Sequence, residues 1–207
     1  MVETLKIFWT FLIANGFPQP ALIEKGLPPD TIVSRLKAVM PNPPQELIDW
    51  FRWQNGYVWD GPRFEETFLI DHGYPIPLDD AIKYYQNAPG NPFDSTDKIF
   101  PILTGGMGPT YYYNFDTSAK AKIYLSTPEL VPVFGSLKQL LTSSREAFSK
   151  KVFWFSDGRF RRDVKERDKL FEHLNPEIDY WKNLPLKDSS IFLIDLEKGT
   201  IEPKNGD

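Results

Sequence analysis

Four short strand-like runs follow one another closely in the middle of the chain, and their spacing limits the possible folds more than any other feature. They are residues 99–103, 110–115, 122–126 and 131–134. Only a few residues connect each run to the next, whereas parallel strands need a crossover of about a dozen residues or more. The sequence therefore predicts an antiparallel meander. Pro101 and Pro132 lack an N–H donor, so we expect them at edges or bulges of the sheet.

Apolar residues at helical spacing predict helices on both sides of this meander. Before it, helices are expected over 5–14, after Pro28-Pro29, from Pro44 to a closing Asn55-Gly56, and over 77–87. After it, Ser136 and Asp163 each match an N-terminal capping pattern, and a short helix is expected within 176–184. Helices grouped before and after a compact run of strands indicate an α+β fold. We expect a central antiparallel sheet of about four to six strands flanked by helices, with a helical C-terminal extension.

The length of 207 residues fits one large domain, or a domain of about 150 residues with an extension. Residues 1–27 are predicted to form an N-terminal helix docked on the core, and residues 28–155 the α+β core itself. Residues 156–207 are predicted to form an extension packed on the same domain, helical at first and strand-like at 190–196. Trp50 and Phe51 lie on the apolar stripe of their helix, so we expect both in the core.

Composition excludes several classes of site. The chain has no cysteine and only two histidines, His72 and His173. This rules out disulfides, thiolate zinc sites, iron–sulfur clusters, a cysteine nucleophile and a histidine-rich metal site. With 24 basic and 28 acidic residues, the net charge of −4 argues against a general nucleic-acid binder. No run of roughly 18 apolar residues is present, so no membrane span is expected and a cytoplasmic location is the default. We expect no metal and no cofactor.

Two segments that could carry chemistry match known catalytic patterns poorly. Gly105-Gly106-Met107-Gly108 is glycine-rich, but neither Lys-Ser/Thr nor a helix follows it, as a phosphate-binding loop requires. Asp71-His72 could be part of a hydrolase site with nearby carboxylates, but neighbouring residues in an extended segment point apart. We therefore expect no catalytic residue and no enzyme. A hydrolase that uses Asp71 and His72 is kept as an alternative.

Aromatic and acidic residues gather between Tyr57 and Tyr74, and this segment is the predicted partner-binding region. Because Trp and Tyr dominate the binding energy of protein interfaces, an aromatic groove rimmed by acidic residues would suit a protein partner. The candidates are Tyr57, Trp59, Asp60, Glu65, Glu66, Asp71 and Tyr74. A separate basic run over 159–169 is interpreted as a solvated, salt-bridged helix face, with a partner-docking patch as the functional alternative.

The order of several short motifs between residues 28 and 150 resembles that of the SUKH superfamily. This superfamily includes cell-wall-assembly regulators of the Smi/Knr type and many bacterial proteins. The helix over 43–56 is similar through Pro44, Leu47, Phe51, Asn55 and Gly56. In the family's order there follow the helix PLDDAIKYYQN, the strand IFPI, a glycine turn before an aromatic strand, the strand AKIYLS and the capped helix FGSLKQLL.

This resemblance implies a non-catalytic binding domain. Bacterial members are similar to immunity proteins that bind and neutralise a cognate toxin, often a nuclease, whereas fungal members act as signalling or cell-wall regulators. The face of the strands and the adjoining loops would contact the partner, which adds Tyr111 and Tyr113 to the candidates by position. The leading hypothesis is therefore an immunity protein. A regulatory scaffold or a small-ligand-binding module is the alternative.

Overall fold

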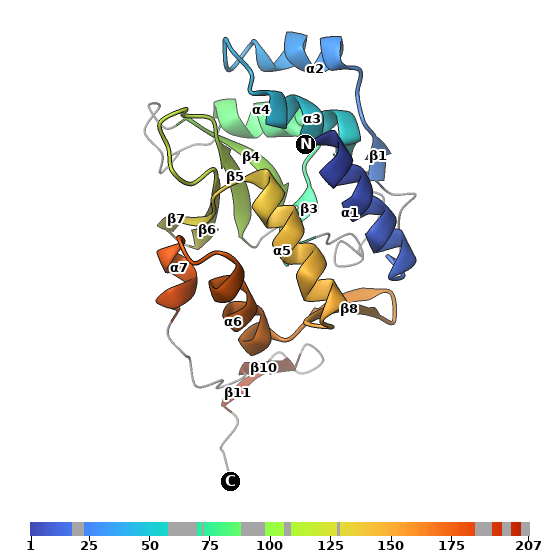
Figure 1. Cartoon of the computed structure of the whole chain (residues 1–207), viewed down its shortest axis with the longest axis vertical. Helices are drawn as coiled ribbons and strands as arrows, with labels where there is room; N and C mark the ends of the chain where they lie inside the picture. The colour runs from blue at the N-terminus through green and yellow to red at the C-terminus, as the bar shows by residue number, and fades with distance from the viewer. Residues whose placement is uncertain are drawn as a thin grey trace.

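The structure is a computed structural model that describes residues 1–17, 23–57, 70–71, 73–87, 98–105, 109–127, 129–184, 192–195 and 200–203. Its helices in these ranges are α1 (Val2–Ala14), α2 (Pro29–Leu36), α3 (Gln45–Trp53), α4 (Leu78–Asn87), α5 (Leu137–Ser149), α6 (Val164–Leu174) and α7 (Asp179–Lys182). Its strands are β1 (Ile23–Lys25), β2 (Gln54–Tyr57), β3 (Tyr74–Pro75), β4 (Ile99–Thr104), β5 (Thr110–Asn114), β6 (Ile123–Thr127), β7 (Glu129–Phe134), β8 (Phe153–Ser156), β9 (Arg159–Arg162), β10 (Phe192–Asp195) and β11 (Thr200–Pro203). The fold is α+β, as predicted (Figure 1).

A five-stranded antiparallel sheet lies at the centre of the fold, in the order β3-β4-β5-β6-β7. The four predicted runs become β4 to β7, and each pairs with the next along the chain. The pairing register shifts beside Pro101 in β4 and beside Pro132 in β7, which confirms the expected bulges. The fifth strand, β3, is only two residues long and pairs with Thr104 and Leu103 of β4.

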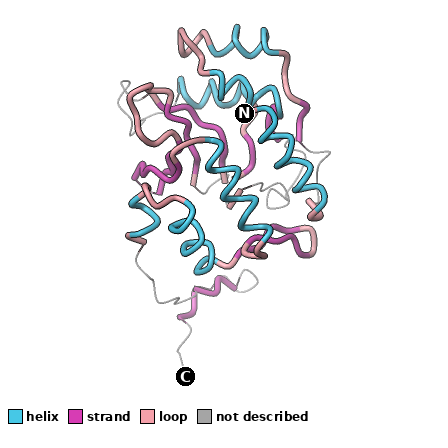
Figure 2. Tube along the Cα trace, viewed as in Figure 1, coloured by secondary structure: helices cyan, strands magenta, loops and turns pink. Residues whose placement is uncertain are grey.

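Helices cover the sheet and form one core with it. Figure 1 shows α5 crossing the molecule, with α1 on one side of it and α6 on the other. Buried side chains from distant parts of the chain join a single hydrophobic cluster, among them Phe8 of α1, Phe100 of β4 and Phe171 of α6. Trp50 and Phe51 of α3 are fully buried, which confirms their predicted position. Figure 2 shows the separate strand pair β8–β9 at the base of α5, away from the main sheet.

The predicted helix caps are formed as the sequence indicates. The side chain of Ser136 accepts a hydrogen bond from the backbone N–H of Gln139, at 3.1 Å, at the start of α5. The side chain of Asp163 accepts one from the N–H of Glu166, at 3.0 Å, at the start of α6. Each bond satisfies a backbone donor that has no partner within its own helix. The start points of α5 and α6, and thus the position of the hairpin between them, are set by local sequence.

Asn55 and Gly56 do not end the preceding helix, which corrects the prediction. Helix α3 ends at Trp53 and the chain continues directly as β2. Gly56 has a φ of 95°, and a Cβ atom there would lie 2.2 Å from the backbone nitrogen of Pro77. Glycine is therefore required by the close approach of the chain that leads into α4. Asn55 accepts a hydrogen bond from the N–H of Leu78 (3.2 Å) and so caps that later helix.

The hairpin β8–β9 is a feature that the sequence reasoning missed. Its strands pair from Phe153 opposite Arg162 to Ser156 opposite Arg159. Asp157 and Gly158 form the turn with φ angles of 52° and 72°, the left-handed geometry that suits the twist of a two-residue hairpin. The predicted boundary between core and extension, at residues 155 and 156, falls within this hairpin.

The extension continues as α6, α7 and then β10, which lies within the predicted strand-like segment 190–196 and pairs with β11. Within the part of the chain that the structure describes, no helix is long and apolar enough to cross a membrane.

Candidate functional site

Asp71 is a buried carboxylate held in a left-handed turn. The N–H of Gly73 donates to the carbonyl of Ile70 at 2.7 Å and closes the turn around it. Asp71 has a φ of 43°, in the left-handed region that few residues other than glycine, asparagine and aspartate adopt readily. Only 2% of the residue is exposed. A carboxylate buried this deeply must be paired, because removing an unpaired charge from water is very unfavourable.

Two arginines from the C-terminal part of the chain provide that pairing. The guanidinium of Arg162, at the end of β9, donates to one oxygen of Asp71 at 2.7 Å. Arg167, in α6, donates to the other oxygen at 2.8 Å. The hydroxyl of Tyr111, in β5, lies 3.4 Å from the same oxygen as Arg167. We call this group of four residues the Asp71 clamp, since it fastens the turn at 70–73 to β5, β9 and α6.

Neighbouring groups complete the electrostatics of the clamp. Burial disfavours the charged form of Arg167, but the carboxylates of Asp71 and Asp168 outweigh this effect and raise the pKa of Arg167. Burial raises the pKa of Asp168, and the guanidinium of Arg167, 2.6 Å away, opposes that rise. Burial, and then the Asp71 charge, raise the pKa of the Tyr111 hydroxyl well above 10.0. Arg167 therefore stays charged and Tyr111 stays protonated across the physiological range.

The clamp is suited to fixing structure. Each oxygen of Asp71 accepts a hydrogen bond from a permanently charged guanidinium, so the carboxylate is held in its ionised form. A general base needs the opposite: a carboxylate whose oxygen can reach the proton of a substrate. His72, the second residue of the alternative hydrolase site, lies outside the described residues.

All but one of the predicted partner-binding residues fall into three groups. Tyr57 is buried and its ring packs edge-on against half-buried Tyr74, at 5.5 Å between centroids. Asp71 and Tyr111 meet in the clamp. Four further candidates lie outside the described residues: Trp59, Asp60, Glu65 and Glu66.

Tyr113 lies apart from the other candidates, on the core side of β5. It is buried, and its hydroxyl donates to Glu46 of α3 at 2.8 Å. The alternation along β5 that makes Tyr111 and Tyr113 candidates therefore directs both towards the core, where neither offers a surface to a partner in this conformation.

The basic run 159–169 is not one solvated helix face, which corrects that interpretation. Its first four residues form β9, and side chains in a strand alternate between the two faces. Arg162 accordingly turns inward to Asp71, whereas Arg159 and Arg161 are exposed on the outer face. Arg167 is also drawn into the interior and lies over the ring of Trp181, with 5.8 Å between guanidinium carbon and centroid. Two of the six basic side chains in the run, Arg162 and Arg167, build the clamp, and Arg159 and Arg161 are exposed.

The outer face of β8–β9 combines these arginines with an exposed tryptophan. Trp154 pairs directly with Arg161 across the hairpin, and 40% of Trp154 is exposed. Beside it is a cavity of about 500 Å³, lined by Asn15, Phe148, Lys151, Phe153, Trp154 and Phe155. The alternating run FWFS, a two-residue Asp-Gly turn and a second alternating run RFRR are together the pattern typical of a hairpin. That pattern could have revealed the face from sequence.

A second cavity, of about 360 Å³, lies between the end of α5 and α6. It mixes charges of both signs, and Lys169 is already paired with Glu166 at 2.7 Å. No group of three or more metal-ligating side chains is found among the residues that the structure describes.

Comparisons with known proteins do not place the chain in a family: no protein-family model matches it, and no curated protein matches it either. The resemblance to the SUKH superfamily stays a prediction.

Proposed function

We propose that this chain is a non-catalytic protein-binding domain that acts as an immunity protein, binding and neutralising a cognate toxin. The observation that carries the proposal is the exposed Trp154 beside a cavity at the hairpin β8–β9. Tryptophan is the residue type most enriched among the anchors of protein interfaces, and such anchors lie next to pockets that exclude water. The order of motifs that resembles the SUKH superfamily supports the same function.

The test is neutralisation of a toxin encoded beside this chain. Cells that express the toxin should grow only when the chain is co-expressed, and the two purified proteins should form a stoichiometric complex. A chain with Trp154→Ala, which removes the anchor, should protect less well. The proposal fails if the wild-type chain neither restores growth nor binds the purified toxin.

The size of the cavity favours one other function, a small-ligand-binding module. Its volume of about 500 Å³ lies within the range of about 300–1,000 Å³ typical of ligand pockets, and four aromatic side chains line it. A metabolite that binds there should raise the melting temperature of the wild-type chain, because a ligand that binds only the folded state stabilises it. The same metabolite should raise the melting temperature of the Trp154→Ala variant by a smaller amount. A panel of metabolites that leaves the melting temperature unchanged would remove this alternative.

A further inference from the structure

The outer surface of the β8–β9 hairpin carries four features that point to one kind of partner. We call this surface the hairpin face and define it by Lys151, Trp154, Arg159 and Arg161. All four are exposed. The inference below rests on the proposed function, since it identifies where and by what chemistry the protein partner is bound.

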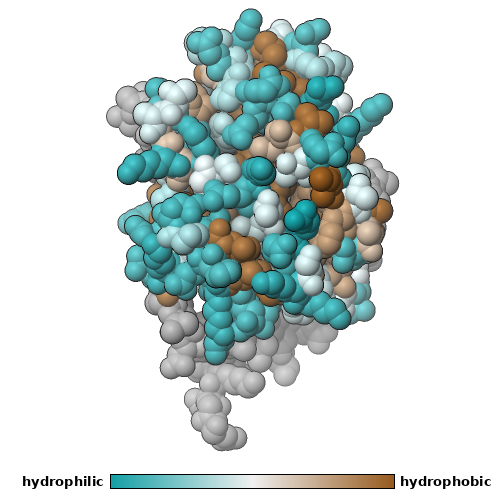
Figure 3. All heavy atoms as spheres, viewed as in Figure 1, coloured by the Kyte–Doolittle hydropathy of each residue, from teal (hydrophilic) through white to brown (hydrophobic). Residues whose placement is uncertain are grey.

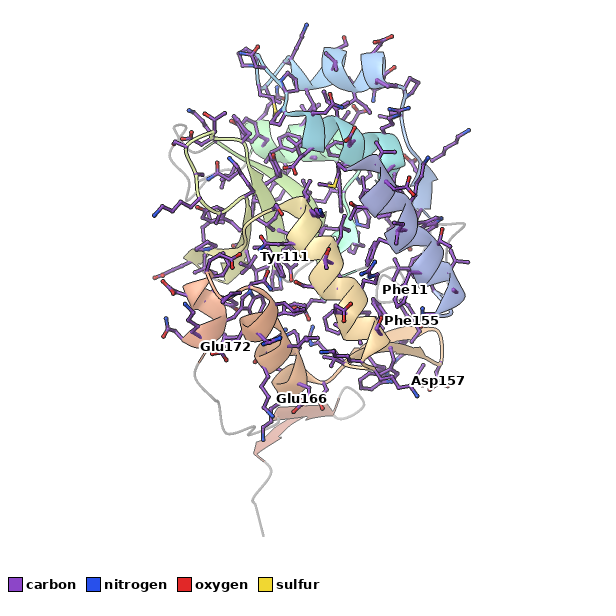
Figure 4. All side chains as sticks on the ribbon, in the orientation of Figure 1. Phe11, Tyr111, Phe155, Asp157, Glu166 and Glu172 are labelled. Atoms are coloured by element: carbon purple, nitrogen blue, oxygen red, sulfur yellow. The ribbon has the colours of Figure 1, made fainter. Side chains whose placement is uncertain are left out.

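The hairpin face is held rigidly from behind. The inner side chains of the hairpin pack on α5: the ring of Phe155 stacks on Phe148 at 5.2 Å between centroids, and Phe153 lies edge-on to Phe148 at 5.6 Å. Phe160, opposite Phe155, packs on Phe153 at 5.0 Å. Figure 4 shows Phe155 on the side of the hairpin that faces α1 and Asp157 at its turn. Because the backbone of the hairpin is already fixed, little conformational entropy would be lost from it when a partner binds here.

Positive charge is concentrated on this face. Residues 150–161 contain four basic side chains and one acidic side chain, Asp157, in a chain whose net charge is −4. The structure records no ion pair for Arg159, Arg161 or Lys151 with any residue in its described ranges. By contrast, the basic side chains of Arg162, Arg167 and Lys169 are all paired within the protein. A partner with acidic side chains would place counter-charges against these three side chains, Arg159, Arg161 and Lys151.

The backbone conformation of Lys151 is an independent indication that this face has a binding role. It occupies the position just after α5 with a φ of 56°, where the N–H groups of Lys151 and Val152 close the helix end on Phe148 and Ala147. Glycine is the preferred residue at this position, because a side chain there is strained. A lysine in a strained backbone conformation, exposed at the edge of a cavity, is the arrangement from which a functional role is inferred.

The cavity beside Trp154 adds an apolar element to this basic surface. Phe148, Phe153 and Phe155 line it together with the tryptophan. On the face of the molecule shown in Figure 3, hydrophobic residues form small separate patches among hydrophilic ones. An interface built from such patches combines a few apolar anchors with charged contacts around them.

We propose that the hairpin face binds an acidic protein segment, which places one apolar side chain in the cavity beside Trp154 and carboxylates against Arg159 and Arg161. A protein is favoured over nucleic acid because the basic patch is short: Asp157 lies in the turn of the hairpin, and Asp163 and Glu166 line a cavity together with Lys151. A long polyanion would meet these carboxylates as it left the patch, whereas a compact acidic segment need not. The partner thus offers a negative surface at this contact, although the protein described here also has a negative net charge.

The first test uses synthetic probes and the full-length chain, labelled with ¹⁵N. An acidic peptide of Asp and Glu with one central Leu, at about 1 mM, should shift the amide and indole resonances of residues 150–161. The same peptide with Lys in place of the acidic residues should not. The proposal is overturned if the acidic peptide shifts nothing at this concentration, if the shifts lie elsewhere, or if a single-stranded oligonucleotide of equal charge binds more tightly.

The second test uses the toxin that the proposed function requires. Trp154→Ala and the pair Arg159→Glu/Arg161→Glu should each weaken the complex roughly tenfold or more. Matched controls are Tyr84→Ala, another exposed aromatic, and the double variant Lys37→Glu/Arg52→Glu, which changes two exposed basic side chains, one just after α2 and one in α3. Full-strength binding by the hairpin variants would overturn this inference and leave the proposed function standing. A wild-type chain that binds the acidic peptide but no toxin would overturn the proposed function alone.

Discussion

Replacing Asp71 with asparagine should destabilise the protein strongly, because it removes the carboxylate that Arg162 contacts and one of the two carboxylates that Arg167 contacts. Asparagine tolerates the left-handed backbone of this position as aspartate does, so Asp71→Asn removes the charge and preserves the turn. Breaking a buried ion pair by removing one partner costs about 3–5 kcal/mol. The side chain of Arg162 keeps 21% of its exposure and that of Arg167 keeps 12%, so some hydration remains for both cations. We therefore expect a loss of stability near the lower end of this range, about 3 kcal/mol.

Urea unfolding followed by tryptophan fluorescence measures this loss. With an m-value of about 2 kcal/mol/M, a loss of about 3 kcal/mol lowers the midpoint by roughly 1.5 M. The control is Asp79→Asn, which breaks the pair between Arg35 and Asp79 (2.7 Å), whose side chains are 41% and 57% exposed. An exposed pair contributes about 0.2–1 kcal/mol, so the control should change the midpoint little. If Asp71→Asn and Asp79→Asn have equal effects, the clamp does not hold the fold together and the reasoning is wrong.

Three further outcomes follow from the packing and the charges. Trp50→Ala should lower the free energy of unfolding by about 3–5 kcal/mol, since the side chain is fully buried, and a loss below about 1 kcal/mol in a denaturant titration would contradict the assigned face of α3. Lys151→Gly should raise the free energy of unfolding by up to about 1 kcal/mol by relieving the left-handed strain, yet weaken partner binding; a variant that is both more stable and equally tight in binding would count against a role for this lysine. Burial raises the pKa of Tyr111, Tyr112 and Tyr113 above 10.0, so their contribution to stability is complete below pH 10 and is lost as the pH rises through the folded-state pKa values. Tyrosinate absorbance should therefore show these groups ionising together with unfolding, and their titration in a still-folded chain near pH 10 would refute the burial.

The parts of the fold that depend on neighbouring residues could be predicted from the sequence. The strands β4 to β7, the bulges at Pro101 and Pro132 and the caps at Ser136 and Asp163 each follow from alternation, a missing N–H or a short-range hydrogen bond. Gly56 was misread because its requirement comes from Pro77, whose backbone approaches it from the start of another helix. Strand β3 is too short for any periodicity to appear and exists only through its pairing with β4.

The site was harder to predict because its members are distant in sequence. Asp71 is separated by 91 residues from Arg162 and by 96 from Arg167, and nothing in the local pattern of either segment indicates the pairing. The basic run was read with helical spacing because Asp163 starts a helix within it. Its first part has the alternation of a strand, which sends Arg161 outward and Arg162 inward. The hairpin face could therefore have been found from the sequence, whereas the clamp could not.

The long separation between Asp71 and its arginines has a consequence during synthesis of the chain. At a synthesis rate of about 5–20 residues per second, the 96 residues between Asp71 and Arg167 take roughly 5–20 s to be made. Until Arg162 is made, 91 residues after Asp71, the turn at 70–73 has neither of its cations, and removing its unpaired carboxylate from water would be unfavourable. In a nascent chain halted before Arg162, this turn would thus stay open. Its sensitivity to protease would show when the clamp forms while the chain is still attached to the ribosome.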